Sequence, residues 1–286
     1  MQEPGKQRSK KRAITLADAR QNKNIRLVQI TDAHLFADKG VIFDGLNTFE
    51  TLKDVIQLIR KQQSEIDCLL CTGDLTQDSS MEAYRHFLEA VSVFDALQLW
   101  IPGNHDTRNQ MQQILPPGTE FLKRSIQLEN WRVIMLDSSV EGEVYGRLAP
   151  KELDDLEMEL ADCERNSHYA LVCLHHNCLP VSAAWLQQHS LKNSDEFFAI
   201  LDRYSLVRGV LYGHIHQALD AQRGDMKIMA SPSTCIQFHP TNDHFTIDNK
   251  NPGYRWIELG ADGEITSGVE RVDEKSYNID FSNTGY

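Results

Sequence analysis

Five short motifs in this sequence gather side chains that bind metal ions. They are D-A-H at 32–34, G-D at 73–74, G-N-H-D at 103–106, H-H at 175–176 and G-H-I-H at 213–216. In D-x-H and H-x-H the two donors stand two residues apart, so an extended backbone places both on one face. One short segment can therefore supply two ligands to the same site.

The donors in these motifs are too numerous for one tetrahedral ion. They suit two ions roughly 3.5–4 Å apart that share a bridging carboxylate. Mixed imidazole and oxygen ligation is compatible with iron, manganese or zinc. With only two carboxylates, the loaded site keeps a formal charge of about +2, which favours an anionic substrate such as a phosphate ester. The candidate ligands are Asp32, His34, Asp74, Asn104, His175, His214 and His216.

The elements around these motifs predict how the motifs meet. Apolar runs at 26–31, 67–72 and 97–102 are typical of strands, and a helical period at 47–62 separates the first two. A second helix is expected to begin at Ser79, with Glu82 completing a capping box. Alternation of this kind predicts βαβ units, in which ligand sites lie beyond the carboxyl ends of the strands.

The second half of the chain adds a hairpin and further strands. Runs at 124–130 and 131–137 predict the hairpin, closed at Glu129 and Asn130. Further helices are expected around Leu153, Leu156 and Leu160 and at 195–204, and further strands at 168–174, 207–213, 226–230 and 254–272, the last interrupted by an Ala-Asp-Gly turn. Each motif then follows a strand, so we expect all five to converge.

Charge and composition narrow the functional classes. The chain has 286 residues, 41% of them hydrophobic, and a net charge of −12. A net +4 on residues 1–12 leaves −16 on the remainder, which disfavours nucleic-acid binding by the folded body. No apolar run approaches the roughly 18 residues of a membrane span, and no signal-peptide core follows the basic start. We expect a cytoplasmic protein with a basic tail at 1–22, a catalytic domain at 23–275 and a C-terminal tail at 276–286.

Cysteine spacing offers a second possible site. Cys68 and Cys71 form a C-x-x-C, a spacing found in redox and zinc sites. They fall in a predicted strand, however, where positions three apart face opposite sides of the sheet. We expect buried, reduced thiols.

The order of the motifs resembles that of the calcineurin-like metallophosphoesterase superfamily over residues 26–217. The stretches LPVSAAWLQQHSLKN and SPSTCIQFHP, with the later PGYRWIELGADGEI, are similar to bacterial class III 3′,5′-cyclic AMP phosphodiesterases, and extend the likeness to about residue 272. The resemblance implies an α/β fold, a four-layered α/β/β/α sandwich of two mixed sheets. It also implies a dinuclear centre of iron, manganese or related ions.

The resemblance implies roles for individual residues. Asp32, His34 and His216 would bind one ion, Asn104, His175 and His214 the other, and Asp74 would bridge them. His105 would stay unligated and donate a proton or hydrogen bond at the reacting phosphate. The residues expected to contact substrate are His34, Asp74, Asn104, His105 and His216.

Two positions depart from the family pattern. Asn177 and Cys178 stand where a third histidine and a proline are common. His175 rather than His176 is taken as the ligand because it aligns with the first histidine of the run. Cys178 is a thiolate ligand, an oxidation-sensitive site or, as we expect, inert packing.

The implied activity is hydrolysis of 3′,5′-cyclic AMP to 5′-AMP by a water that two ions activate as hydroxide, with His105 as general acid. Asp106 either orients His105 or forms a structural ion pair. Another diester as substrate is the nearest alternative, because metal motifs do not set substrate choice. A non-catalytic metal-stabilised scaffold is the second, and His105 argues against it because a structural site needs no such residue. A regulatory nucleotide binder would need a phosphate-binding loop that the sequence lacks.

Overall fold

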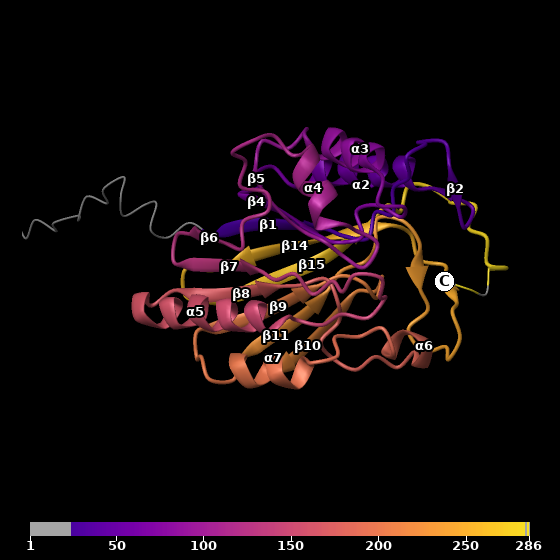
Figure 1. The fold of residues 1–286 in the computed structure, drawn as a ribbon. Coiled ribbons are helices and arrows are strands. Elements are labelled where there is room, and N and C mark those ends of the chain that lie inside the picture. The colour runs from indigo at the N-terminus through magenta and orange to yellow at the C-terminus, as the bar shows by residue number, and fades with distance from the viewer. Residues whose placement is uncertain (1–23, 284, 286) are drawn as a thin grey trace, which may run out of the picture.

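Two sheets packed face to face form the centre of the molecule. The computed structural model describes residues 24–283 and 285, so the predicted tail at 1–22 lies outside the described residues. The first sheet has the order β15-β14-β1-β4-β5 and the second has the order β10-β11-β9-β8-β7-β6. Figure 1 shows the sheets stacked with helices on both outer sides. The predicted four-layered sandwich of two mixed sheets is confirmed.

The first sheet pairs β1 with β4 and β4 with β5 in parallel, while β14 and β15 are antiparallel. Its strands are β1 (Ile25–Ile30), β4 (Cys68–Thr72), β5 (Leu97–Ile101), β14 (Gly253–Leu259) and β15 (Ile265–Arg271). In the second sheet, β7, β8, β9 and β11 run parallel, with β6 and β10 antiparallel at the edges. Its strands are β6 (Ser125–Leu128), β7 (Trp131–Met135), β8 (Tyr169–Cys173), β9 (Val207–Tyr212), β10 (Leu219–Arg223) and β11 (Met226–Ala230).

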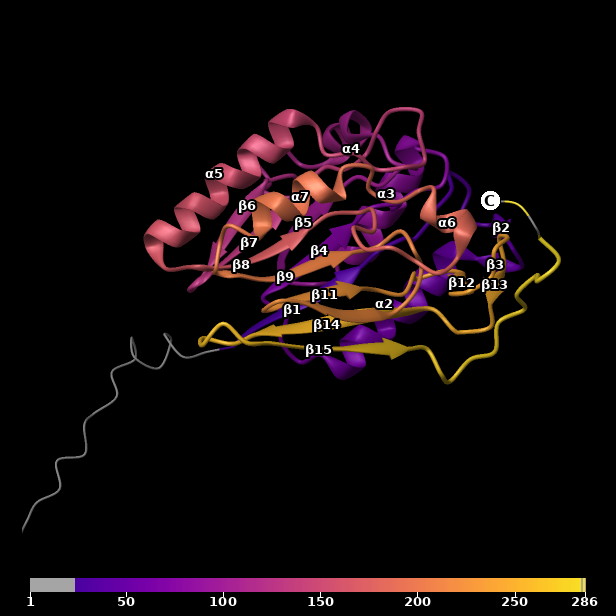
Figure 2. The ribbon, with the colours of Figure 1, turned by 90° about the horizontal axis from the view of Figure 1, so that it is seen from below.

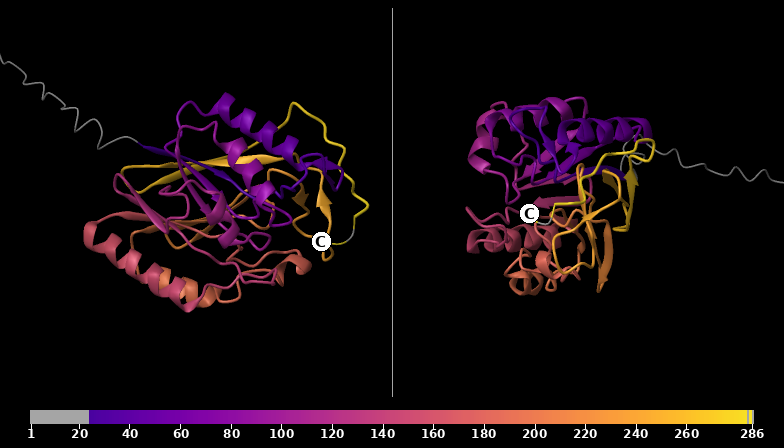
Figure 3. Two further views of the ribbon diagram at one scale, coloured as in Figure 1. Left: turned by 45° about the horizontal axis from the view of Figure 1, so that its top comes forward. Right: turned by 90° about the vertical axis from the view of Figure 1, so that its right-hand side faces the viewer.

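Helices cover the outer face of each sheet, and they lie on opposite sides of the molecule (Figure 3). Those on the first sheet are α2 (Thr48–Gln62), α3 (Met81–Val91) and α4 (Arg108–Ile114). Those on the second side are α5 (Pro150–Asn166), α6 (Ala184–Gln187) and α7 (Ser194–Leu201). Two short hairpins lie together at one end of the sandwich (Figure 2). They are β2 (Ile42–Phe43) with β3 (Leu46–Asn47), and β12 (Gln237–Phe238) with β13 (Ile247–Asp248).

Alternating side chains on each strand fill separate layers of the core. Leu27 packs between the sheets, whereas its neighbour Val28 packs under the helices of the first sheet. Burial of such a side chain is worth about 1.5–3 kcal/mol. Cys68 and Cys71 likewise belong to these two different layers, and all six cysteines are free and buried. The prediction of buried, reduced thiols is confirmed.

The predicted strands and helices of the first half are present, with one correction at a helix start. The N-cap of α3 is Ser80, whose side chain accepts a hydrogen bond from the Ala83 N–H, so the predicted capping box from Ser79 to Glu82 is wrong. Ser79 instead has φ 55° and donates its hydroxyl to the His105 carbonyl at 2.6 Å. Either serine could cap the helix, but Ser79 bonds to the His105 carbonyl, so Ser80 is the cap.

The later elements follow the sequence pattern closely. The hairpin of β6 and β7 turns at Glu129 and Asn130, as predicted, with Glu129 at φ 48°. The strands β14 and β15 pair around the predicted Ala-Asp-Gly turn, where Gly263 has φ 88°. Among residues 24–283, no helix is long and apolar enough to cross a membrane.

The segment that follows the predicted domain boundary at 275 contacts the folded body. The Tyr277 hydroxyl donates to Asp54 at 2.9 Å, and the Asp280 N–H donates to the Asp44 carbonyl at 2.9 Å. Asp44 belongs to the turn between β2 and β3. The division of the chain into tails and a catalytic domain stays a prediction.

Candidate metal centre

The loops that carry the predicted ligands have an unusual backbone. Non-glycine residues with positive φ are uncommon, because each costs about 1–3 kcal/mol and persists only where the surrounding structure enforces it. Among the described residues, five of the seven predicted ligands have such a backbone: Asp32 (φ 54°), His34 (46°), Asp74 (48°), His214 (66°) and His216 (49°). Such strain clusters at functional sites.

Glycines next to the ligands allow this packing in two ways. Gly73 has φ 99°, a conformation that glycine adopts without the strain of a side chain. Gly103 matters instead through close approach, since an added Cβ would collide with the Asp74 carboxylate. The loops after β4 and β5 can therefore meet at Asp74.

Asp32, His34 and His216 form a first group of donors. The His34 Nε2 lies 3.2 Å from the His216 Nε2, which lies 3.4 Å from the Asp32 Oδ1. The opposite ring nitrogens face acceptors: His34 Nδ1 lies 2.6 Å from the Gln77 Oε1 and His216 Nδ1 lies 2.8 Å from the Ile236 carbonyl. Outer contacts of this kind place the hydrogen on Nδ1 and leave the Nε2 lone pair for a metal.

A second group is built around His175. Its Nδ1 donates to the Thr72 carbonyl at 2.8 Å, and its Nε2 lies 3.2 Å from the Asn104 Oδ1 and 3.3 Å from the Asp74 Oδ2. That same Asp74 oxygen lies 3.8 Å from the His34 Nε2 of the first group. Asp74 therefore stands between the two groups, as a bridging ligand must.

Buried atoms without partners show that the donor set fits cations. Within the described part of the chain, the Asp74 Oδ2 and both ring nitrogens of His214 are buried without a hydrogen-bond partner. Each such atom costs about 1–3 kcal/mol. Donor atoms of Asp32, Asp74 and His175 lie within 4.8 Å of one another, close enough to hold one ion. The residues present thus fit a dinuclear metal centre.

Burial and mutual charge give most of the site the protonation that ligation needs. Burial lowers the pKa of His34 to about 3, so its imidazole is neutral. Burial tends to raise the pKa of Asp74, but His175 and other histidines hold it well below its usual range. Burial tends to lower the pKa of His175, but the Asp74 charge raises it to about 9, so a bound cation would have to displace that proton.

His176 lies within reach of the same centre but is occupied otherwise. Its donor atoms lie within 4.8 Å of those of His175 and His214. However, its Nδ1 lies 2.8 Å from the Ser138 hydroxyl and its Nε2 lies 3.2 Å from the Val144 carbonyl. The Nε2 of His175 instead faces Asn104 and Asp74, which are themselves proposed ligands, and this difference favours His175 as the ligand.

The two residues after the histidine pair are structural. The Asn177 amide donates to the Leu179 carbonyl and to the Ser190 hydroxyl. Cys178 is buried in the core of the second sheet, and burial raises the pKa of its thiol to about 12. Such a thiol stays protonated at neutral pH, which agrees with the expectation of inert packing.

His105 is half-buried at the edge of the donor set. Its N–H donates to the Asp74 Oδ1 at 2.9 Å and its ring Nδ1 lies 3.2 Å from the Gln77 carbonyl. Its ring centre lies 5.1 Å from that of His34, edge to face. The structure therefore brings His105 and all seven predicted ligands to one place.

Asp106 contacts backbone groups of two loops of the site. Its carboxylate accepts the backbone N–H groups of Gly103, Leu75 and Thr76 at 3.0, 3.1 and 3.2 Å. It thereby ties the loop after β4 to the loop after β5. These loops carry Asp74, Asn104 and His105.

Sequence reasoning missed the residues that support the ligands from outside. The Ser233 hydroxyl donates to the Asp32 carbonyl at 2.7 Å, which braces a ligand in a strained conformation. Ile236 and Thr72 act through carbonyl groups that every residue has, so no signal in the sequence marks them. Gln77 stands three residues after Asp74, but its amide carries no signal of this role.

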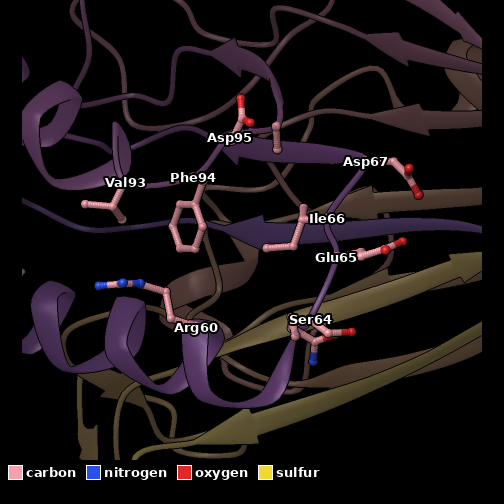
Figure 4. A pocket seen from close by; sticks show the side chains of 10 residues that line it. Arg60, Ser64, Glu65, Ile66, Asp67, Val93, Phe94 and Asp95 are labelled. Atoms are coloured by element: carbon pink, nitrogen blue, oxygen red, sulfur yellow. The ribbon is translucent and has the colours of Figure 1, made fainter.

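A surface hollow of about 470 Å³ lies at the opposite, amino ends of β4 and β5 (Figure 4). It is formed where the chain leaves α2 and where it leaves α3. Its lining mixes acidic, basic and apolar side chains without histidine: Arg60, Gln63, Ser64, Glu65, Ile66, Asp67, Val93, Phe94, Asp95 and Ala96. The hollow is separate from the metal centre and shares no lining residue with it.

Comparison with known proteins agrees with this geometry. Residues 25–218 match the family model described as calcineurin-like phosphoesterase. The 3′,5′-cyclic adenosine monophosphate phosphodiesterase CpdA of Escherichia coli K12 is 41% identical over 263 residues, which cover 92% of this chain and 95% of that protein. CpdA of Pseudomonas aeruginosa is 38% identical over 263 residues, with 92% and 96% covered.

A cyanobacterial protein and two solved structures extend the comparison. A 3′,5′-cyclic-nucleotide phosphodiesterase of Nostoc is 40% identical over 248 residues, with 87% of this chain and 92% of that protein covered. A purple acid phosphatase from yellow lupin aligns with a TM-score of 0.61 at 14% identity, over 90% of this chain and 53% of that one. A dimetal phosphatase from Danio rerio aligns at 0.57 and 14%, over 87% and 99%. These two structures share the fold.

Proposed function

This chain belongs to the calcineurin-like phosphoesterase family, and from that membership we propose that it hydrolyses 3′,5′-cyclic AMP to 5′-AMP. One observation carries the proposal: Asp74 places a buried carboxylate oxygen without a hydrogen-bond partner between two groups of histidines, 3.8 Å from the His34 Nε2 and 3.3 Å from the His175 Nε2. The near-full-length likeness to cyclic-nucleotide phosphodiesterases supports the choice of substrate.

Seven residues would hold the two ions. Asp74 contacts both sites, and iron or manganese is the proposed occupant, with zinc as the alternative. When bound, the ions supply positive charge for the phosphoryl oxygens and lower the pKa of water. The first site is Asp32, His34 and His216, and the second is Asn104, His175 and His214.

The chain's own groups prepare the site for an anion. Only Asp32 and Asp74 are negative among the proposed ligands, and Asn104 contributes a neutral oxygen that leaves the cationic charge uncancelled. A cyclic phosphodiester carries one negative charge, which the net positive charge of the loaded site would attract. The side chains proposed to contact it are His34, Asp74, Asn104, His105 and His216.

His105 is the proposed acid. Hydrolysis adds a water oxygen to phosphorus and breaks the bond to the 3′ oxygen, which needs a proton as it leaves. In the imidazolium form, with its Nδ1–H held at the Gln77 carbonyl, the ring carries a second proton on Nε2 and would give that proton to the leaving oxygen. General-acid catalysis of this kind contributes about 10²–10⁴-fold.

A substrate panel with metal analysis tests the proposal. Protein reconstituted with Mn²⁺ or Fe²⁺ is given 3′,5′-cyclic AMP, 3′,5′-cyclic GMP, 2′,3′-cyclic AMP and an aryl phosphodiester, and its metal content is measured. We expect two ions per chain and the highest kcat/KM on 3′,5′-cyclic AMP. Preference for another diester would replace the substrate, and two bound ions with no hydrolysis would favour a scaffold.

A further inference from the structure

Gln77 contacts two imidazoles of the proposed site, those of His34 and His105. Its side-chain oxygen lies 2.6 Å from the His34 Nδ1, and its backbone oxygen lies 3.2 Å from the His105 Nδ1. One residue therefore contacts a proposed ligand through its side chain and the proposed acid through its main chain.

These contacts decide which ring nitrogen carries hydrogen. A carbonyl oxygen only accepts, so each Nδ1 facing it must be the donor. The other nitrogen of His34, Nε2, then presents its lone pair toward Asp74. If the Gln77 amide were reversed, its NH₂ would donate to Nδ1 and Nε2 would carry the hydrogen, which blocks ligation through that atom.

Gln77 is itself held in place. Its N–H donates to the Leu35 carbonyl at 2.8 Å, and Leu35 forms a parallel bridge with Thr76. The Thr76 N–H is bonded in turn to Asp106. These backbone contacts of Gln77 and Thr76 hold the Gln77 carbonyl in place without substrate.

We propose that Gln77 is a positioning residue that sets the tautomer of His34 and the orientation of both His34 and His105. The inference rests on the proposed function, in particular on the ligand role of His34 and the acid role of His105. It assigns to one amide a task that no metal-binding or catalytic motif records.

Titration of Mn²⁺ into metal-free protein by calorimetry tests the side-chain contact without substrate. Gln77→Met keeps the length of the side chain but removes the acceptor. It should lower the affinity for one of the two ions by about 10–100-fold, while the affinity for the other stays within about 3-fold of wild type. Gln77→Glu keeps an acceptor and should bind both ions within about 3-fold of wild type or more tightly. Gln113→Met makes the same change on the exposed face of α4 and should change neither.

The outcomes separate this inference from the proposed function. Unchanged binding by Gln77→Met, or equal losses in Gln77→Met and Gln77→Glu, overturns the positioning role when wild type takes two ions. A wild-type protein that takes fewer than two ions overturns the dinuclear centre instead. Circular dichroism of each metal-free variant shows whether it is folded.

Nitrogen-15 spectra of the histidine rings test the main-chain contact. The His105 resonances are assigned by their loss in His105→Ala. Their shifts should report a hydrogen on Nδ1, as donation to the Gln77 carbonyl requires. An Nδ1 without hydrogen would overturn this half of the inference, whatever the activity of the loaded enzyme.

Discussion

The Nε2 atoms of His34 and His216 face each other at 3.2 Å, although both rings are buried. Each ring has its Nδ1 against a carbonyl oxygen, of Gln77 and Ile236 respectively, so each Nε2 carries a lone pair. Two lone pairs at this separation repel each other unless a cation lies near both. The pair is therefore arranged for a metal rather than for a hydrogen bond.

Removal of Asp74 should disrupt both metal sites. Asp74→Ala takes away a carboxylate oxygen that lies near both His34 and His175. We expect elemental analysis to find fewer than two ions per chain and hydrolysis of 3′,5′-cyclic AMP to be lost. Full activity in this variant would contradict the bridging role.

Removal of His105 should separate catalysis from metal binding. Its side chain lies at the edge of the donor set, so His105→Ala should retain two ions while kcat falls by about 10²–10⁴-fold. Metal content and steady-state kinetics on the same preparation check this. A variant that loses its metal would instead make His105 part of the ligand set.

The two adjacent histidines should behave differently. His175→Gln should lower metal content, because its Nε2 approaches Asp74 and Asn104. His176→Gln should retain both ions but lower the melting temperature, because it breaks hydrogen bonds with Ser138 and Val144. Metal analysis and thermal melts of both variants decide. The reverse pattern would make His176 the ligand.

The thiols of the native protein should not react with thiol reagents. All six cysteines are buried, and burial raises the pKa of Cys178 and Cys235 to about 12. Because the thiolate is the reactive form, its fraction stays very small at pH 7–8 and grows only as the pH approaches 12. A disulfide reagent should label no thiol at pH 7.5 and six after denaturation. Fast labelling of a folded protein would contradict this burial.

The sequence predicts the ligands better than it predicts their supports. Asp32, His34 and His214 can be identified from the sequence because donors at strand ends form recognisable spacings, and parallel strands bring those ends together. Ser233 and Ile236 are not readable, since one acts through a common hydroxyl and the other through its carbonyl. Their roles follow only from the three-dimensional path of the loop after β11.

Local ambiguity limits the fold prediction in a similar way. Ser79 and Ser80 are equivalent as caps in sequence, and the difference lies in a contact with His105, 26 residues away. The hairpin of β2 and β3 has only two residues per strand, so it leaves no period to detect. Its neighbours include the segment around Asp280, which is remote in the chain.

The left-handed conformation of the ligand residues has an energetic corollary. Glycine adopts that geometry with little strain, so replacing His34 or His216 by glycine would delete a donor and relax the loop together. Such a protein, stripped of ions, would melt at a higher temperature than its equally stripped parent if that relief exceeds the lost side-chain packing plus the conformational entropy that glycine adds to the unfolded chain. At these positions, the residue that binds metal would then differ from the residue that gives the most stable metal-free protein.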